Sequence, residues 1–455
     1  MDTEARTLIV GLGKTGLSCA RFLTARHIPV AVTDSRAEPP GLASLQNELP
    51  EVPLFMGGFN PDIFARAECL VVSPGVSVHE PAIAKAAARG VPVIGDIELF
   101  IRHTHAPVAA ITGSNGKSTV TALLGEMARR ATWQVRVGGN FGTPALDMLG
   151  EDEPDLYVLE LSSFQLETTS SLNARAAVVL NISPDHMDRY ADVEEYTSAK
   201  QRIYMGNGAM IINKDDAAVS AMIEPGRRVL RFGLGEPGSG EFGLRTSEGE
   251  PWLSYGEQPL LPVRELRIKG NHNVSNALAA LALGQALDLP RAAMLAALRE
   301  FPGLPHRSEW VAEQAGIQWY NDSKGTNVGA TLAALQGLAA ASTGKVVLIA
   351  GGDGKGADFT PLRAGVAARA RAVVLIGRDA ALIETALAAV VPVVHARDMT
   401  NAVHAARVLA QSGDAVLLSP ACASFDMYSG YDERGRVFVS AVQAALGASG
   451  RAKKH

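Results

Sequence analysis

The sequence predicts an α/β protein of three domains, each built on an open, mostly parallel sheet with flanking helices. Short apolar runs typical of buried strands alternate along the chain with helical segments, which is the pattern of βαβ units. Polar, glycine-containing segments follow many of these runs, as expected at the carboxyl ends of parallel strands. The chain of 455 residues is also too long for one ordinary hydrophobic core.

The composition is that of a globular protein with no strong charge bias. Hydrophobic residues make up 47% and charged residues 20%, while 42 Lys and Arg against 47 Asp and Glu leave a net charge of −5. We therefore expect no binding to nucleic acid or to membranes, and no apolar run is long enough to span a bilayer. The acidic start, Met1–Glu4, is unlike a signal peptide, so we expect a cytoplasmic protein, and a monomer. Cys19, Cys69 and Cys422 lack the spacing of a metal site or a disulfide framework.

The N-terminal domain is predicted to be Rossmann-like and to cover residues 1–96. Its predicted elements are strand 7–10, a helix through 23, strand 30–33, strand 69–72 and strand 91–95. Between the first strand and the helix lies Gly11-Leu12-Gly13-Lys14-Thr15-Gly16, and Asp34 follows the second strand. A G-x-G-x-x-G turn with an acid about 20 residues further on is the dinucleotide-binding fingerprint. Taken alone, this region would indicate a nicotinamide-dependent oxidoreductase.

A glycine-rich turn in the central region predicts a phosphate-binding loop. Gly113-Ser114-Asn115-Gly116-Lys117-Ser118-Thr119 lies between the apolar strand 108–112 and a helix that runs on from Val120. Backbone N–H groups at a helix start lack intrahelical partners and attract phosphate. Lys117 can neutralise the β and γ oxygens, and the Ser118 hydroxyl can ligate magnesium. The loop is shorter than the ordinary Walker pattern, which would need glycine where Ile111 stands.

The central domain is predicted to be P-loop-like, to cover residues 97–302 and to contain a small β excursion. Its other predicted elements are strands 156–160 and 177–181, a helix over 193–205, short strands within 225–268 and a helical pair over 273–300. Pro290 begins the second helix of that pair, because proline is favoured in a first helical turn.

Residues 303–455 are predicted to form a second Rossmann-like domain, joined through a hinge. Phe301-Pro302-Gly303-Leu304-Pro305 cannot continue a helix, because two prolines and a glycine interrupt it. The predicted strands are 317–320, 346–350, 372–376 and 415–418, with alanine-rich helices between them. The tail 448–455 is expected to fray.

Several polar segments of the central domain carry candidate chemistry. Glu160 ends a predicted strand across the sheet from the phosphate loop, where the magnesium ion of a nucleotide needs an oxygen ligand. His186, within Asp185-His186-Met187-Asp188-Arg189, is consistent with a metal ligand, a base or an ordinary loop histidine. Lys200 by itself is best interpreted as a solvated lysine. The amides within Asn271–Asn276 are more simply helix caps than contacts to a nucleotide base.

The C-terminal domain offers an arginine and three polar loops. His306 and Arg307 follow the hinge, and an arginine on a mobile domain facing a phosphate loop resembles the cis-arginine of phosphoryl transfer. The three loops, each after a predicted strand, are 321–327, 351–356 and 419–426. They present hydroxyls and lysines without a nucleophile–histidine–acid set, which suits binding of a small anion more than covalent catalysis.

In this order, the motifs resemble those of the Mur ligases of peptidoglycan synthesis, and the resemblance runs over nearly the whole chain. The most specific segments are Gly113–Thr119, Leu159–Thr168, Asp185–Tyr190, Gly303–Arg307 and Ser419–Ser424. The resemblance implies an ATP-dependent, amide-forming ligase of cell wall biogenesis, and so of cell shape and division. It would add D-glutamate to UDP-N-acetylmuramoyl-L-alanine through an acyl phosphate and a tetrahedral intermediate, releasing ADP and phosphate.

The resemblance also implies roles for individual positions. The UDP-substrate would contact Lys14, Thr15, Asp34, Ser35, Arg36, Gly75 and Asn140. ATP would contact Gly113, Ser114, Asn115, Gly116, Lys117, Ser118, Thr119, Asn273, Asn276, Arg307 and Asp322. D-glutamate would contact Thr326, Lys355, Ser424 and Tyr431, and many relatives carry phenylalanine at the last position. The implied catalytic residues are Lys117, His186, Lys200 and Arg307.

Two magnesium ions are implied as cofactors. Ser118 and Glu160 would contact one ion, and His186 would hold the other together with Lys200 after carbon dioxide has converted its amine to a carbamate. Because carbamylation turns an ammonium into an anionic oxygen ligand, the resemblance replaces the solvated interpretation of Lys200.

Two other functions are weighed against this one. A related amide ligase with another acceptor, such as folylpolyglutamate synthetase, would resemble the chain only from the phosphate loop onward and would leave the first domain unexplained. A nicotinamide-dependent oxidoreductase built on Gly11–Gly16 would leave the phosphate loop unexplained. With nucleotide and amino-acid sites on different domains, the third domain is expected to close about 301–305.

Overall fold

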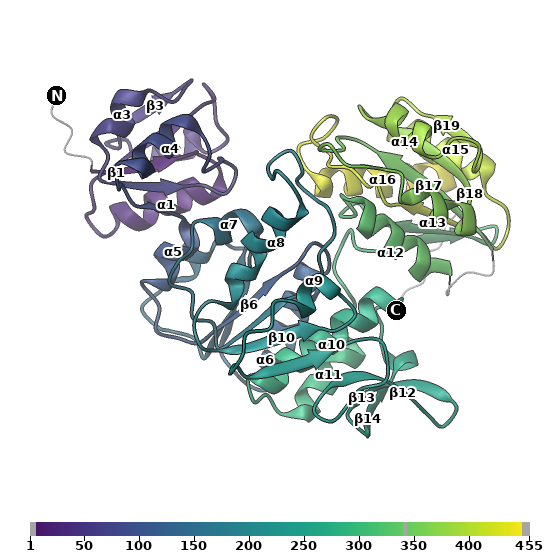
Figure 1. Ribbon diagram of the computed structural model, residues 1–455. Coiled ribbons are helices and arrows are strands. Elements are labelled where there is room, and N and C mark those ends of the chain that lie inside the picture. The colour runs from purple at the N-terminus through teal and green to yellow at the C-terminus, as the bar shows by residue number, and fades with distance from the viewer. Residues whose placement is uncertain (1–5, 340–343, 448–455) are drawn as a thin grey trace.

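The predicted α/β class is confirmed, with three mostly parallel sheets that form three bodies along the chain (Figure 1). The computed structural model describes residues 6–339 and 344–447, so the expectations for Met1–Glu4 and for the tail 448–455 lie outside the described residues. The N-terminal body lies above helices α5 (Asp96–Ile101) and α7 (Ser163–Glu167), and the C-terminal body stands beside the central one (Figure 1). Over the residues described, no helix combines the length and apolarity needed to cross a bilayer.

The N-terminal body is a parallel sheet of five strands in the order β3-β2-β1-β4-β5. Its elements are β1 (Thr7–Val10), α1 (Lys14–Thr24), β2 (Val30–Asp34), α2 (Leu42–Glu48), β3 (Leu54–Met56), α3 (Pro61–Arg66), β4 (Cys69–Val72), α4 (Pro81–Ala88) and β5 (Val93–Ile94). The strand order reverses direction between the neighbours β1 and β4, and ligands bind parallel sheets at such a switch point. The glycine-rich turn after β1 and the Ser73-Pro74-Gly75 turn after β4 therefore lie at the place where a ligand is expected.

The central body holds a sheet of nine strands in the order β14-β13-β12-β11-β10-β9-β6-β8-β7. Its first elements are β6 (Val108–Thr112), α6 (Lys117–Arg130), β7 (Val135–Gly139), η1 (Ala145–Met148), β8 (Leu156–Glu160), β9 (Ala176–Val179), α8 (Val193–Gln201) and η2 (Arg202–Tyr204). Those that follow are β10 (Ala209–Asn213), α9 (Ala217–Ser220), β11 (Val229–Phe232), β12 (Phe242–Ser247), β13 (Glu250–Tyr255), β14 (Gln258–Pro262), η3 (Val263–Glu265), α10 (Asn271–Ala286) and α11 (Arg291–Glu300). Strand β6 lies between β8 and β9, which brings the phosphate loop beside the ends of both.

The β excursion is an extension of the main sheet. Strands β12, β13 and β14 pair antiparallel with one another, and β12 pairs with β11 at Phe232 and Phe242. The strands β7 and β10 were not predicted. The predicted helix over 193–205 is shorter, because α8 ends at Gln201 and a single 3-10 turn follows it.

The C-terminal body is a six-stranded sheet in the order β15-β16-β20-β17-β18-β19. Its elements are β15 (Glu309–Gln314), β16 (Ile317–Asn321), α12 (Val328–Ala339), β17 (Val346–Gly351), α13 (Leu362–Arg369), β18 (Ala370–Ile376), α14 (Ala380–Ala386), β19 (Val393–His395), α15 (Met399–Leu409), β20 (Ala415–Leu418) and α16 (Tyr431–Leu446). The strands β16, β20 and β17 are neighbours and parallel, so the three polar loops that follow them emerge side by side. The unpredicted strands β15 and β19 form the two edges.

The hydrophobic cores join the three bodies unequally. Buried side chains of α1, such as Leu17, belong to one apolar cluster with Phe100 of α5, Leu146 of η1 and Leu159 of β8. The clusters of the C-terminal body, around Leu348 and Val347, contain only residues of that body. The N-terminal and central bodies therefore share a core, whereas the C-terminal body is independently packed.

Candidate active site

Three cavities adjoin one another through shared lining residues. A cavity of about 580 Å³ lies between the N-terminal and central bodies, one of about 380 Å³ between the central and C-terminal bodies, and one of about 130 Å³ beside the phosphate loop. Asn140 lines the first and the second, while Asn115, Gly116, Arg307 and Lys324 line the second and the third. Groups bound in the three cavities could therefore belong to reactants that meet in the middle one.

The first cavity contains the complete set of positions that the sequence assigned to the UDP-substrate. These are Lys14, Thr15, Asp34, Ser35, Arg36, Gly75 and Asn140. Asp34 Oδ2 accepts from the Leu12 N–H at 2.7 Å and from Arg36 Nη2 at 2.7 Å. Burial raises the pKa of Asp34, but these donors outweigh it and hold the pKa below its usual value. Lys14 Nζ donates to the Gly142 carbonyl at 2.6 Å, which ties this cavity to the central body.

The phosphate loop runs from β6 into α6 in the shape that its glycines allow. Gly116 has a φ of 84°, and a Cβ at that position would lie 2.3 Å from Asn276 Oδ1, so a side chain would meet both strain and a clash. Lys117 Nζ donates to the Gly113 and Ser114 carbonyls at 2.7 and 2.9 Å, and so curls back over the loop. Its amine thus lies where phosphate oxygens bound by the loop would be expected.

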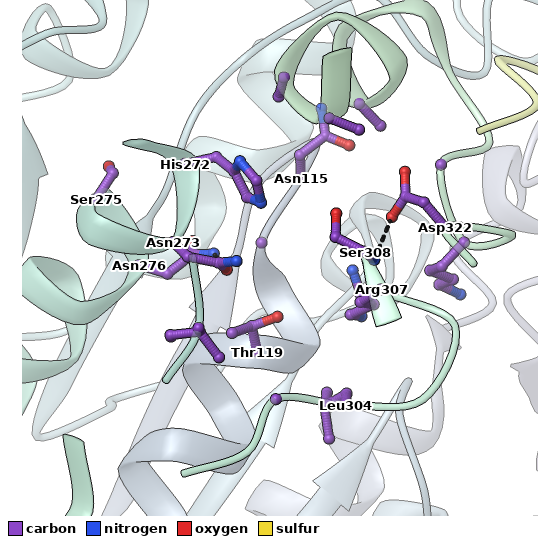
Figure 2. A pocket seen from close by; sticks show the side chains of 18 of the residues that line it. Asn115, Thr119, His272, Asn273, Ser275, Asn276, Leu304, Arg307, Ser308 and Asp322 are labelled. Carbon is purple, nitrogen blue, oxygen red and sulfur yellow. Dashed lines mark hydrogen bonds between the residues drawn. The ribbon is translucent and has the colours of Figure 1, made fainter. Parts of the chain in front are cut away.

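The smallest cavity separates two amides of α10 from residues that follow the hinge (Figure 2). Asn273 and Asn276 lie on one side, and Arg307, Ser308 and Asp322 lie on the other. The interpretation of the Asn271–Asn276 amides as helix caps is wrong. The N-cap of α10 is Gly270 with no side-chain cap, Asn276 Nδ2 donates to Asn273 Oδ1 at 3.2 Å, and Asn273 Nδ2 donates to the Lys269 carbonyl at 2.9 Å.

A chain of charged contacts connects the C-terminal body with the phosphate loop. Arg307 Nη2 donates to Ser118 Oγ at 2.7 Å, and Ser118 Oγ donates to Glu160 Oε2 at 2.5 Å. The other Glu160 oxygen accepts from Asn140 Nδ2 at 2.6 Å. The arginine thus reaches across the cleft to the helix start, although 189 positions separate it from Ser118 in the chain.

Asp322 supports the arginine side of the cleft. Its Oδ1 accepts from the Ser308 N–H at 3.0 Å, and its Oδ2 accepts from Ser419 Oγ at 2.7 Å. Burial raises the pKa of Asp322 to about 6, with Ser419 opposing the rise. The carboxyl group therefore fixes Ser308, the residue after Arg307, to the end of β16.

The middle cavity gathers the positions assigned to D-glutamate and most of those assigned to metal and catalysis. Thr326, Lys355, Ser424 and Tyr431 come from the loops and the α16 start of the C-terminal body. Lys117, Glu160, His186 and Lys200 come from the central body. Ser118 is almost fully buried and does not line this cavity directly, but it contacts Glu160 behind the wall. An acid group bound on one side would face an amine bound on the other.

Lys200 is buried, at 2% exposure, which overturns its interpretation as a solvated lysine. Its Nζ donates to the Gly113 carbonyl at 3.1 Å and lies 4.5 Å from the Tyr196 ring centroid. Burial first, and then the charge of Lys117, lower the pKa of Lys200 well below its usual value. A lowered pKa raises the fraction of the lysine that carries a neutral, nucleophilic amine.

His186 adopts a left-handed backbone, with a φ of 59°. Burial lowers the pKa of His186 to about 4, with Asp185 opposing and Lys355 adding to the shift. A neutral imidazole is the form that ligates metals. Its ring packs edge-on against Phe164, with the centroids 4.9 Å apart.

The donor set fits magnesium that also binds a nucleotide. Within the described ranges, no group of three or more His, Cys, Asp or Glu side chains is arranged as a metal cage. Glu160 with Ser118 supplies a carboxylate and a hydroxyl, which are hard oxygen ligands. Magnesium commonly takes one or two protein oxygens and completes its shell with phosphates and water, so these residues fit the ion.

Lys324, Asp185 and Asn327 are among the polar residues of the middle cavity that were not assigned a role from the sequence. Lys324 lines both the middle cavity and the cavity beside the phosphate loop. Burial, and then the charge of Arg307, lower the pKa of Lys324 to about 7. Its Nζ lies 3.7 Å from the Tyr431 ring centroid. Asp185 and Asn327 contact each other across the cleft at 3.1 Å. All three stand in segments that the sequence singled out, but contacts across domains leave no trace in local patterns.

Three family models together match most of the chain. They are Mur ligase MurD-like, N-terminal domain, over residues 5–95; Mur ligase middle domain, over residues 111–284; and Mur ligase, glutamate ligase domain, over residues 306–422.

Two bacterial ligases are similar to the chain over almost its full length. The UDP-N-acetylmuramoylalanine--D-glutamate ligase of Nitrosococcus oceani is 60% identical, over 98% of this chain and 98% of the relative. The protein of the same name from Pseudomonas putida is 55% identical, over 95% of this chain and 96% of the relative.

Among solved structures, two similar folds cover the chain almost completely. UDP-N-acetylmuramate-alanine ligase from Thermotoga maritima has a TM-score of 0.62 at 20% identity, over 97% of this chain and 99% of that one. A pseudomurein peptide ligase type C from Methanothermus fervidus has a TM-score of 0.62 at 18% identity, over 96% of this chain and 100% of that one. At these identities the likeness concerns the fold alone.

Proposed function

The chain belongs to the Mur ligase family, and on that premise we propose that it joins D-glutamate to UDP-N-acetylmuramoyl-L-alanine at the expense of ATP. It is an amide-forming ligase of peptidoglycan synthesis. Neither the nicotinamide interpretation of the Gly11–Gly16 turn nor another acceptor is favoured by its relatives, which carry the name of the D-glutamate-adding enzyme over almost their full length.

One observation carries the proposal. The middle cavity has phosphate-loop and metal-binding groups of the central body on one wall and the Thr326, Lys355 and Ser424 side chains of the C-terminal body on the other. A carboxylate that enters from the first cavity past Asn140 would reach both the γ-phosphate of ATP and an amino acid bound by those C-terminal side chains. That is the meeting required for ATP-driven amide formation.

The first step activates the carboxylate. An oxygen of the L-alanine carboxylate attacks the γ-phosphorus of ATP, the bond to the bridging oxygen breaks, and ADP leaves with that electron pair. Lys117 offsets charge on the transferred phosphoryl group, and Arg307, which donates to Ser118 at 2.7 Å, is within reach of the same group.

The second step forms the amide. The ammonium of D-glutamate first releases a proton to solvent, and the resulting neutral amine attacks the carbonyl carbon of the acyl phosphate, so that a tetrahedral intermediate forms. Its collapse expels inorganic phosphate, which takes up the extra proton of the amine nitrogen and leaves as hydrogen phosphate. Because the reactants are held in adjoining cavities, positioning supplies much of the rate.

Magnesium, when bound, offsets phosphate charge during the transfer; Ser118 and Glu160 would hold one ion, and His186 would hold a second with a carbamate on Lys200. The carbamate forms when the neutral Lys200 amine attacks carbon dioxide and releases a proton. The burial of that amine and its lowered pKa support this modification, because an ammonium cannot react in this way.

We further propose the three domains to be 1–96, 97–302 and 303–455, and the enzyme to act as a monomer in the cytoplasm. The separate sheets and the hinge-like segment Phe301–Pro305 support the division. The nucleotide substrates of the reaction support the location, since ATP and UDP-linked precursors are cytoplasmic metabolites.

A phosphate-release assay tests the function. The protein is incubated with ATP, magnesium, UDP-N-acetylmuramoyl-L-alanine and D-glutamate, and parallel reactions omit one component or replace D-glutamate with L-glutamate. We expect phosphate release and a new UDP-linked product only with the complete mixture. Phosphate release that does not depend on D-glutamate would contradict the proposal. Turnover with a different amino acid would indicate another acceptor.

A further inference from the structure

An ion pair crosses the middle cavity between the central and C-terminal bodies. Lys355 Nζ donates to Asp185 Oδ1 at 2.5 Å, and Asn327 Nδ2 donates to Asp185 Oδ2 at 3.1 Å. The Asp185 and Lys355 side chains are only 9% and 15% exposed, so water screens the pair poorly. Asp185 follows β9 in the central body, whereas both of its donors belong to the C-terminal body.

The two oxygens of Asp185 are held differently. Oδ2 is bound by Asn327, whose amide is itself fixed by the Ala330 N–H at 2.8 Å and by Asn115 Oδ1 at 3.1 Å. Oδ1 is oriented by the His186 N–H at 2.9 Å and also accepts from the side chain of Lys355. If Lys355 moved away, the carboxylate would keep its orientation and one oxygen would be open to a new cation.

The bound amino acid supplies both reasons for such an exchange. Lys355 is a cationic partner for a carboxylate of D-glutamate, and taking it would leave Asp185 as a shielded, uncompensated anion, which is costly. The same molecule brings an α-ammonium. The acidic residues lining this cavity are Glu160 and Asp185, and both oxygens of Glu160 are already occupied by Ser118 and Asn140.

We propose that Asp185 is the residue that binds the α-ammonium of the incoming amino acid. D-glutamate inserts into the Asp185–Lys355 ion pair: one of its carboxylates takes Lys355, and its ammonium takes the place of Lys355 on Asp185 Oδ1. This inference rests on the proposed function and deepens it. Each charge of the pair is matched by an opposite charge of the zwitterion, so the exchange leaves no buried charge alone.

The proposal predicts that Asp185 recognises the amine and Lys355 the carboxylate. In the wild-type enzyme, D-glutamate should therefore bind at least about 10-fold more tightly than glutarate, which lacks the amine, because a charged hydrogen bond is lost. Glutarate affinity is measured as competitive inhibition against D-glutamate. This comparison needs no variant.

The variant Asp185→Asn separates recognition from structure. We expect its KM for D-glutamate to rise by about 10- to 100-fold, because an amide cannot compensate the ammonium charge. Its glutarate inhibition constant should stay the same or fall, since Lys355 is freed, and its KM for ATP should be unchanged. The control is Asp188→Asn, which removes an exposed acid three positions along the same loop and should change none of these values.

Three results would overturn the proposal: an unchanged KM for D-glutamate in Asp185→Asn, an equal loss of affinity for D-glutamate and glutarate, or equal binding of the two by the wild type. An equal loss would show that Asp185 acts only on the shape of the site. Failure of the proposed function is distinguishable, because wild-type enzyme would then release no D-glutamate-dependent phosphate at all.

Discussion

At the scale of single residues, burial decides chemistry that the residue type leaves open. Lys200 and Lys214 are both lysines of the central body. Lys214 pairs with Glu241 at 2.9 Å and keeps an ordinary surface role. Among the residues that the structure describes, Lys200 has no carboxylate as a hydrogen-bond partner and contacts a backbone carbonyl and an aromatic ring instead. Only the second environment favours a neutral amine, which is the form that can take up carbon dioxide.

Replacing Lys200 with alanine tests that chemistry. We expect Lys200→Ala to lower turnover by on the order of 10²- to 10³-fold, because the variant lacks the carbamate that would hold the second magnesium ion against the phosphate charge. Millimolar acetate or propionate should restore part of the activity by supplying the missing carboxylate. The matched control, Lys214→Ala, should keep its activity and should not respond to the acids.

A second measurement detects the modification without turnover. Wild-type enzyme under ¹³C-labelled carbon dioxide should show a carbamate carbon signal that is missing from Lys200→Ala. Full activity of Lys200→Ala without added acetate or propionate would contradict the carbamate. Identical carbon spectra of the two proteins would contradict it as well.

At the scale of elements, the short helix α5 joins the first two bodies through buried acids. Glu98 accepts from the Ser170 and Ser171 N–H groups at 2.7 and 3.0 Å, and is well satisfied. Asp96 Oδ2 accepts from Gln165 Nε2 at 2.9 Å, whereas its Oδ1 has no hydrogen-bond partner within residues 6–339 and 344–447. Burial raises the pKa of Asp96 from 3.8 to about 6, with Gln165 opposing the shift.

The raised pKa of Asp96 predicts a pH-dependent stability. A carboxyl group whose pKa is higher in the folded state stabilises the fold fully at low pH, and that contribution is lost as the pH rises through the folded value. Between pH 4 and pH 8 the free energy of unfolding of the wild type should therefore fall by about 2 to 3 kcal/mol relative to that of Asp96→Asn, because the amide side chain of that variant cannot ionise.

Urea unfolding of both proteins across this range measures the difference. Glu151→Gln removes an exposed acid of the central body and should follow the wild type. A constant difference between wild type and Asp96→Asn at every pH would rule out ionisation of Asp96 as the cause.

At the scale of the whole molecule, the distribution of cores predicts which bodies move together. Leu17 of α1 packs in the same cluster as Leu159 of β8, whereas Leu348 of β17 packs only within the C-terminal body. Between the central and C-terminal bodies, the contacts described above are polar, such as Arg307 with Ser118 and Asn327 with Asn115. Polar contacts across a cleft can be broken and remade at lower cost than a shared apolar core.

Calorimetry of wild type and three variants tests this coupling. We expect two unfolding transitions. Leu17→Ala and Leu159→Ala should both lower the midpoint temperature of the same transition, because each costs about 2 to 5 kcal/mol of unfolding free energy. Leu348→Ala should lower the midpoint temperature of the other transition, at a similar cost. One transition shifted equally by all three variants would show that the bodies unfold as a unit.

Much of the fold and of the nucleotide site follows from local sequence, because their signals are local. The phosphate loop needs a buried strand, glycines and a helix in consecutive positions, and Val108–Thr112, Gly113–Thr119 and α6 provide them. The edge strand β15 was missed because its two charged residues, Glu309 and Glu313, resemble those of a surface loop. The amides of α10 were misinterpreted because a capping role and a pocket-lining role use the same residue types.

The sequence alone determined the α/β class, the phosphate loop, the turn that lines the first cavity and, through resemblance, the family. Tertiary structure alone decided that β16, β20 and β17 lie side by side, that Lys200 is buried, and that Lys355 pairs with Asp185 across 170 positions. The reason is physical: strand propensity and turn chemistry act between near neighbours, whereas burial and ion pairing depend on which distant segments the packing brings together.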